Sequence, residues 1–171
     1  MVKIRLWGLA AAVLLLGGTW WLFGGDRDLR KITRQSERLA AALHKAPGDG
    51  LLGLATRSHD IAGFFASKVT LTPGEPLPSI QSRDELVPLV ATTLHAACRL
   101  EVNILDSEVS WVEPHQKAAM RVAVEVTVEG QGERQKLMHT YDVTWIREEE
   151  CWVIASACVS ESIRRPAGSD H

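Results

Sequence analysis

The sequence predicts an α+β fold, in which an N-terminal transmembrane helix precedes helices packed on a strongly bent antiparallel sheet. Three observations predict it: an uncharged apolar run near the start, helical apolar spacing in the middle, and alternating apolar residues towards the end. Helices that precede a run of strands are typical of α+β layers. We expect a membrane anchor over residues 1–25, one domain over 26–160 and a flexible tail over 161–171.

The apolar run extends from Leu6 to Phe23 without a charged residue. At about 1.5 Å per residue, a helix of this length spans roughly 27 Å, close to the hydrocarbon core of a bilayer. Trp7, Trp20 and Trp21 lie at its two ends, where aromatic rings favour the headgroup region. A cleaved signal peptide also has a basic start and an apolar core, but no Ala-x-Ala cleavage pattern follows. We therefore expect an uncleaved, single-pass anchor with these five residues as membrane contacts.

Basic residues lie on both sides of this run, with Lys3 and Arg5 before it and Arg27, Arg30 and Lys31 after it. The count of basic residues therefore does not decide the orientation. A short basic leader before a long folded domain is the usual plan of a signal anchor. We expect a bacterial inner-membrane protein whose C-terminal domain is periplasmic, with the lipid bilayer as a partner.

Composition excludes several classes of function. The formal net charge is −2 and charges of both signs are interspersed, so nothing indicates nucleic-acid binding. The three cysteines form no CxxC motif and no Cys/His ligand set, so we expect neither a metal nor a cofactor. Cys151 and Cys158 would lie about 23 Å apart on one strand, too far for a disulfide. Cys98 could pair with either of them, but we favour three buried, reduced thiols.

Helical spacing begins directly after the anchor. Apolar residues in the segment 26–45 recur at steps of three and four, which predicts an amphipathic helix. Its apolar stripe could form a coiled-coil dimer, but it covers fewer than three heptads and includes Ser36, so we favour packing on a sheet. A short helix is expected around Leu51–Arg57. A third helix begins at the capping box Ser82-Arg-Asp-Glu85, and Pro88 implies either a kink or a later start.

Strand patterns occupy the remainder of the chain. A short strand is expected over residues 64–71, followed by a proline-rich loop. The segment 99–112 alternates but changes parity, which indicates a bulge near residues 105–108. Clean alternation predicts strands over 118–129 and 135–147, and a last strand is expected over 151–160. These strands form a bent meander, and Arg121, Glu125, Lys136 and Asp142 lie on its solvent face.

This order of elements resembles the nuclear transport factor 2-like superfamily, which includes SnoaL-type polyketide cyclases and ketosteroid isomerase. The resemblance covers about residues 26–159. It is carried by three stretches: Ser82-Arg-Asp-Glu-Leu86, Leu100-Glu-Val-Asn-Ile104, and Tyr141-Asp-Val-Thr-Trp-Ile-Arg147 continued by Cys151-Trp-Val-Ile-Ala-Ser156. The chain departs from the usual Asp-Gly turn by carrying three glutamates at 148–150. The resemblance implies a cone-shaped domain whose interior holds the site in those members that are enzymes.

Isomerase-like chemistry in such a cone needs an inward carboxylate base opposite a tyrosine or a protonated acid. Tyr141 and His139 share a strand face, so both are expected to point inward, while Asp142 faces away. Asp106 or Glu108 could turn inward at the bulge. We favour the plainer alternative, in which His139 and Tyr141 are ordinary wall residues and no residue is catalytic. The predicted lining of the interior consists of Trp111, Met120, Val122, His139, Tyr141, Trp145 and Trp152.

Two classes of function remain. The favoured one is a membrane-anchored extracytoplasmic binding or assembly domain without catalytic activity, with a homodimer or a membrane-complex component as its partner. In plan, though not in motif, this is similar to periplasmic domains of type IV secretion subunits and of Mce-associated proteins. The alternative is a small-molecule binding protein, or an enzyme of the lyase or isomerase type, that holds a small apolar ligand in the cone. An interior filled by Trp and Met side chains would favour the first class.

Overall fold

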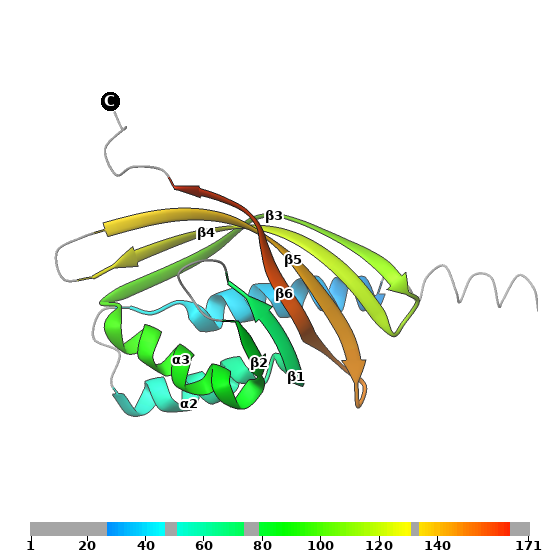
Figure 1. Ribbon diagram of the computed structural model, residues 1–171, viewed down its shortest axis with the longest axis horizontal. Helices are drawn as coiled ribbons and strands as arrows, with labels where there is room; N and C mark the ends of the chain where they lie inside the picture. Colours follow the sequence, from blue (N-terminus) through cyan, green and yellow to red (C-terminus); the bar gives the residue numbers. More distant parts are fainter. Residues whose placement is uncertain (1–26, 47–50, 74–78, 131–133, 165–171) are drawn as a thin grey trace, which may run out of the picture.

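A computed structural model describes residues 27–46, 51–73, 79–130 and 134–164. Figure 1 shows helices packed beneath a long, strongly bent sheet, which confirms the α+β class. The six strands lie in the order β2-β1-β6-β5-β4-β3. The sheet is mixed, because β1 lies beside β6 and runs parallel to it. The expectation of a wholly antiparallel sheet was therefore wrong at this one pairing.

Within the described ranges, six strands make up the sheet, and most follow the expected ranges. They are β1 (Phe65–Thr72), β2 (Ile80–Ser82), β3 (Arg99–Glu113), β4 (Lys117–Glu129), β5 (Arg134–Glu148) and β6 (Cys151–Arg164). The sequence pattern missed β2, because three residues are too few for alternation to appear. It also ended the last strand at Ser160, whereas β6 continues to Arg164 along β5.

The N-terminal helix occupies residues 27–43. Its apolar stripe packs into the core as expected, with Ile32 fully buried and Leu29, Leu39 and Leu43 partly buried beside it. The helix α2 (Leu51–Ala62) extends five residues beyond the predicted end, and Ile61 near its C-terminus is buried. Burial of that extra turn accounts for the longer helix.

The helix α3 (Arg83–Ala96) begins where the capping box predicts. The Ser82 hydroxyl accepts a hydrogen bond from the backbone N–H of Glu85, and the Glu85 carboxylate accepts one from the N–H of Gln81. The helix continues through Pro88, so it does not start later. Pro88 is exposed, and the Thr92 hydroxyl donates to its carbonyl oxygen.

The expected bulge lies in β3. Ile104 is paired with Val124 and Asp106 with Ala123, so Leu105 is the extra residue. Leu105 is 49% exposed. On the N-terminal side of the bulge, Leu100 and Val102 face the helices. Beyond the bulge, Ser107, Val109 and Trp111 lie on the inner face. The insertion bends the strand and keeps an apolar set inward on both sides.

A buried lysine joins the N-terminal helix region to α3 and β3. Lys45 is 7% exposed, and its ammonium group donates to the carbonyl oxygens of Leu94 and Ala97 at 2.5 and 2.6 Å. Its backbone also forms an isolated bridge with Leu100. Orphan carbonyls at the end of α3 are thereby satisfied by a cation, the favourable charge at a helix C-terminus.

Within the described residues, no helix combines the length and the apolar character needed to cross a bilayer. The anchor residues Leu6, Trp7, Trp20, Trp21 and Phe23 lie outside the described ranges. The transmembrane part of the expected fold therefore stays a prediction.

Candidate functional site

The residues predicted to line a pocket form a packed interior on the inner face of the sheet. Trp145, Met120 and Trp152 are at most 3% exposed, and all three belong to the main core cluster. The rings of Trp111 and Trp152 lie 5.6 Å apart at 49°, which is a favourable tilted contact. Large side chains therefore fill this part of the cone.

Tyr141 and His139 share the inner face of β5, as predicted, and their ring centroids are 5.9 Å apart. Burial raises the pKa of the Tyr141 phenol above its ordinary value, because it disfavours the charged phenolate. Within the described part of the chain, neither side chain forms a hydrogen bond with a carboxylate. The pair alone therefore lacks the base that isomerase-like chemistry requires.

The acids that could have supplied this base lie on the opposite face of the sheet. Asp106 and Glu108 line hollows on the outer face, so the alternative in which one of them turns inward is not observed. The physical reason is the position of the bulge: Leu105 absorbs the extra residue, and Glu108 is then paired with the outward Arg121. Asp142 also faces outward, as predicted, and accepts a hydrogen bond from Arg121 Nε at 2.9 Å.

Among the described residues, three buried side-chain polar atoms have no hydrogen-bond partner. They are Gln35 Oε1 on the N-terminal helix, and His139 Nδ1 and Trp145 Nε1 on β5. A buried polar atom without a partner is unfavourable by about 1–3 kcal/mol, and such atoms are commonly matched by water or a ligand. The interior is thus not wholly apolar in character.

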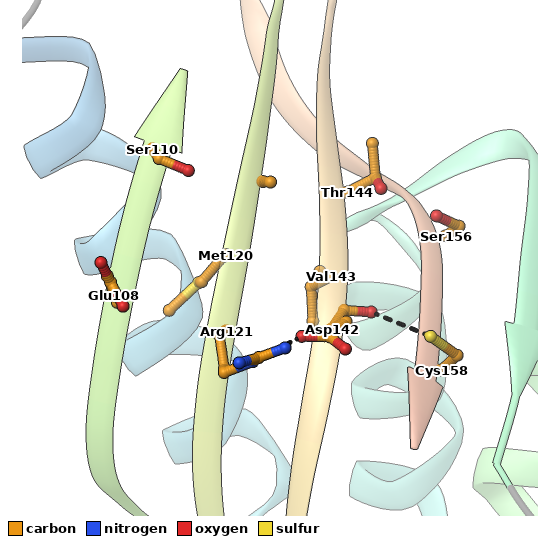
Figure 2. A pocket seen from close by; sticks show the side chains of 10 residues that line it. Glu108, Ser110, Met120, Arg121, Asp142, Val143, Thr144, Ser156 and Cys158 are labelled. Atoms are coloured by element: carbon orange, nitrogen blue, oxygen red, sulfur yellow. Dashed lines mark hydrogen bonds and ion pairs between the residues drawn. The ribbon is translucent and has the colours of Figure 1, made fainter. Parts of the chain in front are cut away.

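The outer face carries two adjoining hollows that share Glu108 and Arg121. Figure 2 shows the residues that line the larger of these two. The larger has a volume of about 390 Å³ and crosses β3, β4, β5 and β6. Its lining residues are Glu108, Ser110, Ala119, Met120, Arg121, Asp142, Val143, Thr144, Ser156 and Cys158. The second hollow measures about 350 Å³ and is bordered by Asp106 and Thr140. Short side chains and charges of both signs line this open surface, which is mainly apolar in the larger hollow and mainly polar in the smaller one.

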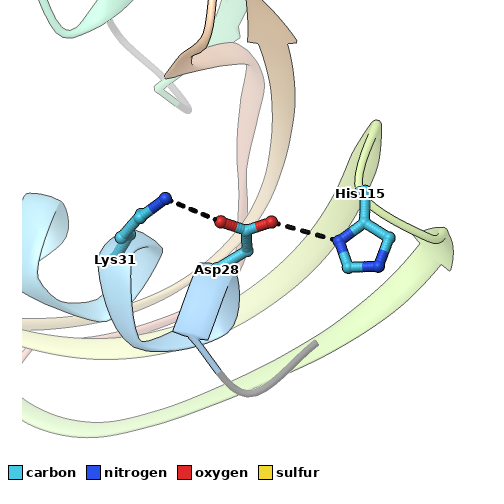
Figure 3. Close-up of polar contacts among 3 residues, drawn as sticks. All are labelled: Asp28, Lys31 and His115. Carbon is cyan, nitrogen blue, oxygen red and sulfur yellow. Dashed lines mark hydrogen bonds and ion pairs between the residues drawn. The ribbon is translucent and has the colours of Figure 1, made fainter. Parts of the chain in front are cut away.

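A polar cluster that the sequence did not predict joins the start of the N-terminal helix to the turn between β3 and β4 (Figure 3). Asp28 is 8% exposed and contacts Lys31 Nζ at 2.9 Å and His115 Nδ1 at 3.1 Å. Burial raises the pKa of the Asp28 carboxyl, but the bonds from Lys31 and His115 outweigh it, so the pKa is lower than usual. His115 has a φ of 60° and lies 5.3 Å from the Trp111 ring. The left-handed backbone conformation of His115 is a feature of the turn that the sequence pattern did not indicate.

The cysteines differ from the expectation. All three are free and exposed, so neither the disulfide with Cys98 nor the buried thiols are observed. A second bulge explains Cys158: Ala155 is an extra residue between Ile154 and Ser156, and it moves the following residues to the other face. Among the described residues, no group of three His, Cys, Asp or Glu side chains is arranged to hold a metal ion.

Comparison with solved structures identifies the fold as that of nuclear transport factor 2-like proteins. A candidate scytalone dehydratase from Novosphingobium aromaticivorans superimposes with a TM-score of 0.62 at 12% identity, covering 82% of this chain and 89% of that one. The association domain of CaMKII from C. elegans gives 0.60 at 12% identity, covering 81% and 98%. A candidate dehydratase of the NTF2-like family from Streptomyces avermitilis gives 0.59 at 16%, covering 78% and 95%.

No family model matches the sequence, and no curated protein matches it. At these identities the structural likeness defines the fold, and function must be argued from the residues themselves.

Proposed function

We propose that this chain is a binding or assembly domain without catalytic activity, held at the periplasmic face of the bacterial inner membrane by residues 1–25. One observation carries the non-catalytic part. The inner face is filled by Trp145, Trp152 and Met120, and no carboxylate of the described chain bonds to Tyr141 or His139. General acid–base catalysis needs such a group within hydrogen-bonding distance of the reacting proton.

A second copy of the chain is the partner that we favour. The fold is shared with a domain named as an association domain, and the sheet face opposite the helices offers a broad surface that carries charges of both signs. Arg121 and Asp142 form an ion pair at its centre, and Lys136 and Glu125 form another at 2.9 Å. An interface built here would be polar, with charges of both signs available for a symmetry-related copy.

The membrane location rests on the uncharged run from Leu6 to Phe23. Its length suits a bilayer, and the tryptophans at its ends suit the headgroup region. Tethering a domain in two dimensions also raises the effective concentration of the copies, which favours weak self-association.

Native mass spectrometry of the full-length protein, released from detergent micelles, tests this proposal. We expect a mass that is a multiple of 18.8 kDa, the mass of one chain, with no bound small molecule. Arg121→Glu should shift the distribution towards the single chain, because it places like charges beside Asp142 and Glu108. Lys68→Glu on β1 is the matched control, since Lys68 is exposed and away from these hollows. A single chain that carries a stoichiometric small molecule would contradict the proposal.

A second candidate function is small-molecule binding or lyase-type chemistry inside the cone. It is favoured by the unpartnered buried atoms of Gln35, His139 and Trp145, and by the candidate dehydratases among the structures that share the fold. A co-purified ligand that is lost in His139→Phe but kept in the surface variant His59→Phe would support this candidate. If no ligand co-purifies with either variant, the assembly function remains the favoured proposal.

A further inference from the structure

Three segments far apart in the sequence meet at one end of the domain, which we call the hairpin end: the helix start (residues 27–31), the β3–β4 turn (114–116) and the β5–β6 turn (149–150). Asp28 of the helix contacts His115 of the first turn at 3.1 Å. The N–H of Arg147, just before the second turn, donates to the carbonyl oxygen of Gln116 at 3.0 Å. Figure 1 shows the two hairpins and the start of the blue helix at the same side of the molecule.

The link between the apolar run and this end is short. The run ends at Phe23 and the helix is under way by Arg27, so four residue steps separate them. A chain extends by at most about 3.6 Å per residue, which limits the separation to roughly 14 Å. Because Asp28 is bound to His115, the β3–β4 turn is held close to the same place.

From this geometry we propose that the hairpin end faces the lipid headgroups, with the opposite end of the sheet directed away from the membrane. The inference rests on the proposed membrane tether and adds an orientation to it. Zwitterionic phospholipids are the partner that the surface fits.

The exposed groups of the hairpin end carry both charges that such headgroups require. Arg27 and Lys31 on the helix are exposed and can meet phosphates, while Glu149 and Glu150 in the second turn are exposed and can meet ammonium groups. Val112, beside the first turn, is 52% exposed and adds an apolar contact. The balance of charges does not favour a strongly anionic surface, which the two glutamates would oppose.

The three exposed cysteines lie at different heights along the sheet. Cys151 is paired with Glu148 at the hairpin end. Cys158 is level with Asp142, in the middle of β5. Cys98 precedes β3, and its backbone N–H donates to the carbonyl oxygen of Glu129, at the far end of β4. The 15 residues of β3 correspond to as much as roughly 50 Å of strand, so the thiols form a ladder.

The ladder allows a direct test with the full-length chain in phosphatidylcholine and phosphatidylethanolamine vesicles. Three variants, each keeping one cysteine and replacing the other two by serine, are labelled with a thiol-reactive fluorophore. Vesicles containing a lipid with a paramagnetic headgroup should quench Cys151 most, Cys158 less and Cys98 least. Vesicles without the paramagnetic lipid provide the baseline. Equal quenching at Cys98 and Cys151, or the reverse order, would overturn the orientation.

A second measurement uses the unmodified chain and so does not depend on the variants. Vesicle reconstitution should slow the reaction of Cys151 with a bulky water-soluble maleimide several-fold relative to Cys98, read by peptide mass spectrometry. An unchanged ratio contradicts the orientation while leaving the tether intact. Failure of the full-length chain to float with the vesicles overturns the tether and the orientation together, so the two failures are distinguishable.

Discussion

Asp28 and His115 are 87 positions apart in the sequence, and their side chains meet at 3.1 Å. The contact joins the first described turn of the N-terminal helix to the β3–β4 turn. The pair therefore holds the described start of the chain beside this hairpin.

We expect Asp28→Asn to destabilise the domain by about 1–3 kcal/mol, because it removes a buried charge that two side chains bind. Urea unfolding of the full-length chain in detergent, followed by tryptophan fluorescence, measures the change. Asp60→Asn is the matched control, since Asp60 is exposed on α2. Equal effects of the two substitutions would contradict the assigned role of Asp28.

The same pair predicts a pH dependence. The folded-state pKa of Asp28 is lowered, so its contribution is complete above the unfolded value of about 3.9 and is lost as the pH falls through the folded value. The stability difference between wild type and Asp28→Asn should therefore be constant near neutral pH and should shrink in acid. A difference that grows on acidification would show that the carboxylate is not the stabilised form.

Lys45→Met should lower the free energy of unfolding by about 1.5–3 kcal/mol, because the carbonyl oxygens of Leu94 and Ala97 lose their charged donor inside the domain. Methionine preserves most of the aliphatic stem, so the change reports the ammonium group. Thermal unfolding by circular dichroism provides the measurement, and Lys68→Met, at an exposed position, should leave the midpoint unchanged. Comparable midpoints for the two variants would refute the capping role.

Deletion of Leu105 should leave β3 with its register and its faces unchanged, and Leu105→Ala should be nearly neutral. The deletion removes the extra residue of the bulge, so Asp106 follows Ile104 directly, and every later residue of β3 keeps its partner on β4 while the local bend is lost. The substitution changes a side chain that is already 49% exposed. Amide hydrogen exchange of β3 and β4 measures whether the pairing is kept, and loss of native protection in β3 beyond residue 106 in the deletion variant would be incompatible with the assigned register.

Tyr141 is the single tyrosine of the chain, so its ionisation can be followed directly by phenolate absorbance. Burial raises its pKa, so the absorbance should appear above the ordinary midpoint of about 10 in the folded protein. The corresponding stability is present below pH 10 and is lost as the pH rises through the folded value. Tyr141→Phe supplies the spectral baseline. A midpoint at or below that of the unfolded chain would contradict the buried position.

Periodicity predicted the sheet well where strands are regular. Alternation in β4 correctly placed Met120 and Val122 inward and Arg121 outward, because the side-chain period is two in any regular strand. Predictions failed where one residue shifts the parity. The faces of Asp106 and Glu108 depended on which residue formed the bulge in β3. The face of Cys158 depended on the bulge at Ala155 in β6.

Other features lie beyond what a single sequence specifies. Asp28 and His115 carry no shared local pattern, since their contact arises from the path of the whole chain. The burial of Lys45 likewise depends on where α3 ends. The filled interior, in contrast, was foreseeable in composition, because Trp111, Trp145 and Trp152 all fall on inward positions of predicted strands.

Membrane association tests the central claim most directly. The full-length chain is expressed in bacteria, and the membranes are washed with alkaline carbonate and floated on a density gradient. The account predicts that the wild-type chain stays with the floated membranes and that Leu14→Arg combined with Leu15→Arg releases it, while Leu105→Arg, outside the apolar run, does not. Recovery of the wild-type chain in the soluble fraction would contradict the account.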